Sequence, residues 1–120
     1  QMPEIVTLNE KLDIIEIRSF GDVTVKDIED SFREIKRMRE ESGTERVLVD
    51  ATGQASMPGT TDTFKITSNM PRFVRIAVYA IEGQATENDL ILVETLAVSC
   101  GAIFRVFFSK EEAVDWLTNP

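Results

Sequence analysis

The chain has 120 residues, 42% hydrophobic and 28% charged, which is the composition of one globular domain spanning residues 1–120 and excludes extensive disorder. Its net charge of −8 argues against nucleic acid as a partner, because binding to phosphates requires clustered Lys and Arg. A single cysteine excludes an internal disulfide and no apolar run could span a bilayer, so we expect a cytoplasmic protein without stable membrane insertion.

The first elements along the chain are two short runs of strand-forming residues, 5–8 and 12–18. A polar turn separates them, which predicts an antiparallel hairpin. A helix should begin at Thr24, because Asp27 three residues later completes a near capping box. Apolar residues then recur at helical spacing on one side, and Gly43 marks the end of the helix.

The rest of the chain alternates strands with helices. Expected strands cover residues 46–50, 74–81 and 103–108, and expected helices cover 60–69, 86–100 and a terminal segment that begins with a capping box at Ser109. The order ββαβαβαβα predicts an α/β fold with helices packed on a mixed sheet of five strands. The first hairpin strand should lie at an edge of this sheet.

The order of elements resembles the STAS fold, and nearly the full length of the chain resembles the SpoIIAA-like group, also described as STAS/SEC14-like. Three stretches carry this resemblance. They are Gly-Asp-Val-Thr at residues 21–24, Val-Leu-Val-Asp at 47–50, and the ending 106–117 with its Val-Phe-Phe start and Trp-Leu close. The resemblance implies a STAS-like single domain. It also implies two functions: regulation of a protein partner, or SEC14-like binding of a small lipophilic ligand.

A threonine switch is implied by the same resemblance. STAS regulators that antagonise anti-sigma factors carry Asp-Ser-Ser-Gly about eight residues after a strand that ends in Asp, and the second Ser is phosphorylated. Counted from Asp50, this motif falls on Pro-Gly-Thr-Thr at residues 58–61, so Thr60 takes the phosphoacceptor position and Thr61 follows it. The other three positions depart from the family pattern.

Two loops repeat one pattern: a carboxylate at the end of a strand, then Gly-Gln-Ala and a hydroxyl residue. The residues concerned are Asp50, Gly53, Gln54 and Ser56 in the first loop, and Glu82, Gln84 and Thr86 in the second. Both loops should lie along the sheet edge where open α/β sheets bind ligands, so these residues are candidates for a loop site that binds a ligand or partner. Alternatively, the glycines serve turns and the hydroxyls cap helices.

Catalysis has little support in the sequence. The chain contains no His, which is the commonest general base and metal ligand. Cys100 shares the apolar side of its helix and is expected in the core. Asp50 and Glu82 could act as paired carboxylates only if the fold brought them together. We therefore expect no enzyme activity, no catalytic residue, no cofactor and no metal.

Apolar residues supply the last candidates. Met57, Phe64, Met70 and Phe73 add flexible bulk around the second helix, where they could line an apolar pocket or fill the core. Ile91 and Val98 lie outside the main apolar arc of the helix 86–100. They could pack on a neighbouring helix, line a pocket, or form an exposed interface, including that of a homodimer.

The function predicted from the sequence is a non-enzymatic, STAS-like regulatory and protein-interaction module, switched at a threonine that begins the second helix. The alternative is SEC14-like binding of a small lipophilic ligand between the helices and the sheet. The expected partner is therefore a protein or a small apolar molecule.

Overall fold

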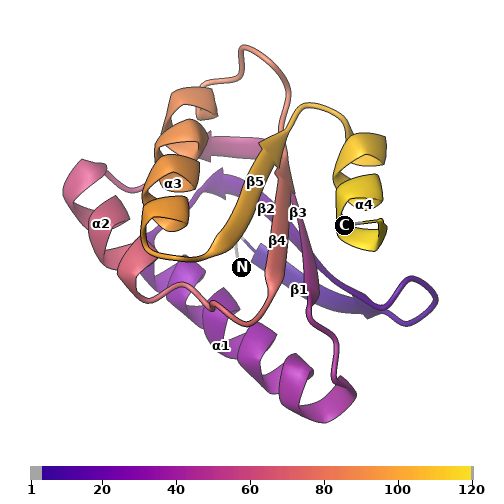
Figure 1. The fold of residues 1–120 in the computed structure, drawn as a ribbon. Coiled ribbons are helices and arrows are strands. Elements are labelled where there is room, and N and C mark those ends of the chain that lie inside the picture. Colours follow the sequence, from indigo (N-terminus) through magenta and orange to yellow (C-terminus); the bar gives the residue numbers. More distant parts are fainter. Residues whose placement is uncertain (1–3, 120) are drawn as a thin grey trace.

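The computed structural model describes residues 4–119, and its five strands form one mixed sheet in the order β1-β2-β3-β4-β5 (Figure 1). The strands are β1 (Glu4–Asn9), β2 (Ile14–Asp22), β3 (Arg46–Ser56), β4 (Arg75–Tyr79) and β5 (Ile103–Phe107). β1 and β2 pair antiparallel, and the other neighbours pair parallel. The predicted α/β class, element order and edge position of the first strand are confirmed.

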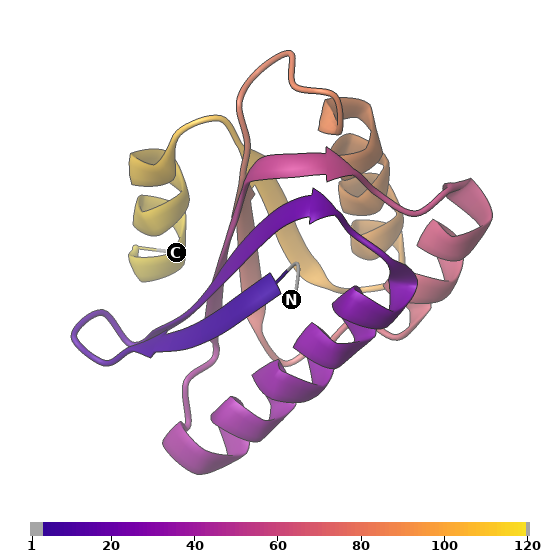
Figure 2. The same cartoon turned by 180° about the vertical axis from the view of Figure 1, so that it is seen from behind.

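Four helices cover the sheet unequally. They are α1 (Val25–Ser42), α2 (Thr60–Ser68), α3 (Glu87–Ser99) and α4 (Lys110–Thr118). Helices α1, α2 and α3 lie on one face, whereas α4 lies alone on the other (Figures 1 and 2). No helix within residues 4–119 combines the length and the apolar composition needed to cross a bilayer.

The alternation of side chains along the strands builds a separate core on each face. Ile15 and Ile17 are buried among the residues of the larger core, under α1, α2 and α3. Ile14 and Leu48 are buried in the smaller core under α4. At its edge, the Arg75 guanidinium lies 3.9 Å from the centre of the Trp116 ring. Helix α4 is thereby fixed to β4 by packing and by a cation–π contact.

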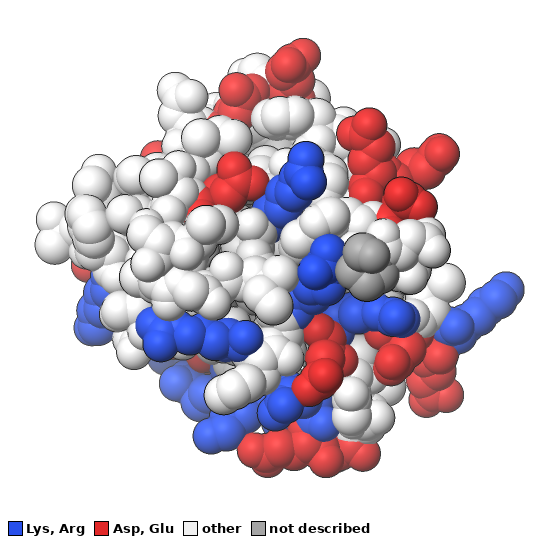
Figure 3. Space-filling model, in the orientation of Figure 1, with Lys and Arg blue, Asp and Glu red and all other residues white. Residues whose placement is uncertain are grey.

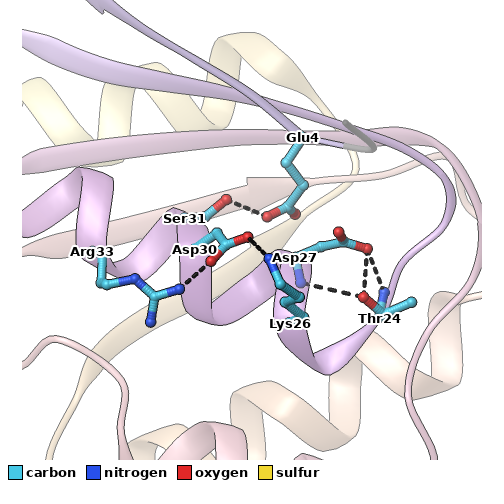
Figure 4. A network of polar contacts seen from close by, with 7 residues as sticks. All are labelled: Glu4, Thr24, Lys26, Asp27, Asp30, Ser31 and Arg33. Carbon is cyan, nitrogen blue, oxygen red and sulfur yellow. Dashed lines mark hydrogen bonds and ion pairs between the residues drawn. The ribbon is translucent and has the colours of Figure 1, made fainter. Parts of the chain in front are cut away.

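The ends of α1 match the local signals in the sequence. The Thr24 side chain accepts a hydrogen bond from the Asp27 amide at 3.2 Å, and Asp27 accepts one from the Thr24 amide at 2.9 Å (Figure 4). Gly43 ends the helix with φ 76°, in the left-handed region that glycine adopts without strain. The predicted capping box and glycine stop are therefore confirmed.

Strand β3 is longer than the sequence predicts. It continues six residues past Asp50 to Ser56, because Gly53, Gln54 and Ser56 pair with the end of β2 after a shift in register. A Cβ atom on Gly53 would lie 3.0 Å from the Phe20 Cβ, which is tighter than ordinary van der Waals contact, so this close approach of the two strands favours glycine. The extension was missed because these polar residues lack a strand-like apolar pattern.

Candidate functional site

The two segments that share the Gly-Gln-Ala pattern, the end of β3 and the β4–α3 loop, meet at the carboxyl ends of β3 and β4. The Gln84 amide nitrogen donates to Thr86 Oγ1 at 2.8 Å, and Thr86 Oγ1 donates to Gln54 Oε1 at 3.2 Å. The Gln54 amide nitrogen then donates to Ser19 Oγ at 3.0 Å. The Thr86 side chain makes no cap hydrogen bond to α3, so the capping interpretation of this hydroxyl is wrong. These polar groups bind one another and tie α3 to β2 and β3.

The row of polar groups continues to a buried carboxylate that the sequence did not indicate. Glu4 faces Ser19 across the β1–β2 pair, is only 8% exposed, and accepts a hydrogen bond from the Ser31 hydroxyl of α1 (Figure 4). Burial raises the pKa of Glu4, although hydrogen bonds from Ser31 and Ser19 oppose this shift. The only signal in the sequence was the alternation that places Glu4 on the same face as Val6 and Leu8.

An apolar cavity of about 80 Å³ lies between the sheet and helices α1, α2 and α3. Its apolar lining includes Phe32, Met57, Ile66, Met70, Leu90 and Val93, and its polar lining is Glu4, Ser31 and Gln54. Two of the predicted pocket residues, Met57 and Met70, therefore line it. Pockets that hold drug-sized ligands measure roughly 300–1,000 Å³, so this cavity accepts only a small group unless it opens.

The other apolar candidates point outward. Phe64 is 57% exposed and Phe73 is 76% exposed, and neither lines the cavity. Ile91 and Val98 on α3 are 39% and 56% exposed, so packing on a neighbouring helix of the same chain does not explain them. An interface with a partner or a second copy remains the hypothesis for these two residues.

Helix α2, which covers part of the cavity, is weakly determined by its own sequence. It has nine residues, four of them Thr, and Gly59 at its start provides no side-chain cap. Thr63 and Thr67 return hydrogen bonds to the carbonyls of Gly59 and Thr63, at 3.0 and 3.1 Å. Threonine lowers helix propensity and such bonds bend helices, so the sequence of α2 supports its helix less strongly than the sequence of α1 does.

The predicted phosphoacceptors Thr60 and Thr61 are the first two residues of α2, and both are exposed. The exposed Ser56 hydroxyl donates to Asp22 Oδ1 at 2.8 Å and takes no part in the row of polar groups. Glu82 is exposed in the β4–α3 loop. The fold therefore separates the loop candidates: Gln54, Gln84 and Thr86 join the row of polar groups, whereas Ser56 and Glu82 are exposed.

Asp50 belongs to a different hollow, of about 310 Å³, on the sheet face beside α4. Burial works to raise the pKa of Asp50, but hydrogen bonds from Thr52 and Tyr79 and the charge of Arg18 outweigh it and lower this pKa. Burial, with the charge of Asp50, raises the pKa of Tyr79 to about 12. Both shifts move these groups away from the neutral range that favours general acid–base catalysis.

Metal binding finds no ready donor set in the described part of the chain. Within residues 4–119, no three Cys, Asp or Glu side chains are grouped so that they could hold a metal ion.

Comparison with known proteins identifies the fold of this chain. No known family model matches the chain, and no curated protein matches it either. Among solved structures, it is similar to an uncharacterised protein of the DUF3478 family, with a SpoIIAA-like fold, from Shewanella loihica PV-4. The TM-score is 0.63 at 18% identity, over 95% of this chain and 93% of that chain. The chain therefore has a SpoIIAA-like fold, as its resemblance predicted.

Proposed function

We propose that this chain is a non-enzymatic binding protein that holds the apolar part of a small lipophilic ligand between its sheet and α1, α2 and α3. The observation that carries the proposal is the apolar cavity of about 80 Å³, with the Glu4 carboxylate on its wall. Close-packed cores leave few voids larger than a water molecule, so a cavity of this size is a feature to explain.

Opening of the cavity depends on α2. This helix contributes Ile66 to the cavity wall, and the flanking Met57 and Met70 can adapt their shape to a ligand. Displacing α2 and these methionines would enlarge the cavity and leave the sheet, α1 and α3 in place. The weak capping and threonine content of α2 make it the mobile wall in this proposal.

The first test is native mass spectrometry of the protein purified gently from its own cells, compared with its denatured mass. An added mass that is lost on denaturation is the expected result.

The second test is titration calorimetry with decanol, a neutral ten-carbon probe, on a matched pair of variants of α3. Val93 lines the cavity, whereas Val98 on the same helix is exposed.

Val93→Met should weaken decanol binding on the order of tenfold or more, because the longer side chain occupies the space that the ligand needs. Val98→Met should bind decanol like the parent protein. Equal affinities for the two variants, or an empty native protein that binds no decanol, would contradict the proposal. Thermal unfolding of each variant checks that the fold is retained.

A second function, regulation through the threonines of α2, is favoured by one observation. Thr60 and Thr61 are exposed at the start of a helix whose Gly59 cap leaves its first amides without a side-chain partner. A phosphate there would add nearly two negative charges at the helix end that favours them. It would also alter the surface of α2 and hence its position over the cavity.

Replacing Thr60 and Thr61 with Ala should remove any phosphate that the protein gains in its own cells. The measurement is the intact mass and peptide map of parent and variant, with Thr95→Ala on α3 as an exposed threonine control. Phosphate that persists in the double variant would place the modification elsewhere.

A further inference from the structure

A further hollow, separate from the apolar cavity and from the hollow beside α4, has a volume of about 550 Å³ and lies between α1 and the connection from α2 to β4. Its charged lining consists of four cations, Arg33, Lys36, Arg39 and Arg72, and one acid, Glu40. Phe73 also lines it, and the Arg39 guanidinium lies 5.3 Å from the centre of the Phe73 ring. We call this hollow the basic groove.

The charge of the basic groove is opposite to that of the whole chain. Four of the 13 basic side chains gather there although the net charge is −8. Figure 3 shows basic side chains gathered along the lower left of this face, beside α1. Arg33 and Arg39 are paired with Asp30 and Glu45. Within residues 4–119, Lys36 and Arg72 form no ion pair, so their charges are available to an anion.

The basic groove and the apolar cavity share a wall. Phe32, Ile35 and Met70 line both. Val74, which also lines the groove, immediately precedes β4, whereas Gln54 of the cavity lies at the far end of β3, a parallel strand. The groove therefore lies where β4 begins, and the polar row from Gln84 to Glu4 lies at the opposite side of the sheet, where β3 ends. The cavity lies between the groove and the polar row.

From this arrangement we propose that the ligand is an amphiphile with an anionic head group, a carboxylate or a phosphate. The head group lies in the basic groove near Lys36 and Arg72, and the apolar chain enters the cavity between Phe32 and Met70. This inference rests on the proposed binding function and adds the chemistry of the ligand and its route.

The physical support is complementarity at both ends of the ligand. Cations that are not neutralised by the protein attract an anion and guide its approach. Arginine presents a planar fork that matches carboxylate and phosphate geometry. Exposed Phe73 offers apolar area beside these charges, where the first part of an alkyl chain would lie. The unbranched side chain of Met70 can change its rotamer as an alkyl chain passes, together with the displacement of α2 that the proposed function requires.

The test compares three ten-carbon probes by titration calorimetry: decyl phosphate, decanoate and decanol. The parent protein should bind the two anions on the order of tenfold more tightly than decanol. Lys36→Gln combined with Arg72→Gln should remove this difference and leave decanol binding unchanged. The control variant, Lys26→Gln with Lys110→Gln, loses the same charge outside the groove and should keep the preference. High salt should reduce it in the parent protein.

The outcomes separate this inference from the function on which it rests. If all three probes bind equally in the parent and in both variants, the anionic head group is wrong and the apolar cavity function stands. If no ten-carbon probe binds, the function itself fails. If inorganic phosphate binds as tightly as decyl phosphate, the groove is a simple anion site and the amphiphile is wrong. If both double variants lower the preference for the anionic probes equally, this preference reflects net charge alone and the head-group site in the groove is wrong.

Discussion

Glu4 is a charged residue on the core side of an edge strand. The β1–β2 register sets it opposite Ser19, and α1 brings Ser31 to its carboxylate. A buried carboxylate is costly unless it is hydrogen-bonded, and here two hydroxyls meet that need. The cost that remains appears as the raised pKa of Glu4. Glu4 therefore makes folding stability depend on pH.

Because its pKa is higher in the folded than in the unfolded chain, Glu4 binds its proton more tightly when folded. Its contribution is most favourable below the unfolded value of 4.5 and is lost as pH rises through the folded pKa. Glu4→Gln keeps an oxygen acceptor and removes the titration. The free energy of unfolding of the variant should therefore rise relative to that of the parent as the pH rises from 4.5 to 7.

Urea unfolding at several pH values measures this difference. Glu10→Gln, at an exposed position in the β1–β2 turn, is the control and should follow the parent at every pH. A difference between Glu4→Gln and the parent that stays constant with pH would show that the carboxylate is not buried as described.

Among the elements, β5 shows how an edge strand is protected. It pairs with β4 on one side only, and the Val106 amide donates to the Glu94 carboxylate of α3 at 2.7 Å. Unpaired edge amides are templates for pairing with other chains, and proteins cover them to avoid aggregation. Glu94 thus fastens α3 to the edge strand and occupies one of these amides.

Glu94→Ala should lower the free energy of unfolding by about 1–3 kcal/mol, because it removes a charge-assisted hydrogen bond and leaves an amide unpaired. It should also increase self-association near the melting temperature. Thermal unfolding followed by light scattering measures both effects, and Glu94→Gln, which retains an acceptor, should lie between the variant and the parent. Parent-like stability and scattering in Glu94→Ala would mean that the contact does not protect the edge.

How well an element could be predicted depended on where its stabilising contacts lie. Helix α1 was predictable because Thr24, Asp27 and Gly43 act on neighbours within a few residues. The end of β3 was not, because its pairing with β2 follows a register shift that no local pattern records. The sequence of helix α3 placed Ile91 and Val98 outside its main apolar arc, but it could not decide whether a neighbouring helix would cover them, because that depends on tertiary packing.

At the scale of the whole molecule, the two faces of the sheet differ in the size of their cores and in the hollows that they carry. The face under α4 carries a small core and the Asp50–Tyr79 cluster, whose pKa values are moved away from neutrality. The face under α1, α2 and α3 carries the larger core, the cavity, and the polar row at one edge. The basic groove adjoins this second face at the other edge. Both proposals rest on this arrangement, in which the basic groove and the cavity share the wall formed by Phe32, Ile35 and Met70.

The sequence by itself determined the order of the elements, the caps of α1, the SpoIIAA-like fold and the position of Thr60 at the start of a helix. It also indicated that the two Gly-Gln-Ala loops would lie on one edge. These features depend on periodicity and on contacts between residues close in the chain. Only the tertiary structure decided the burial of Glu4, the closure of Gln54 onto Ser19, 35 residues away, and the gathering of Lys36 and Arg72. Burial and charge clustering arise between distant segments, and their energies exist only once packing has fixed which segments meet.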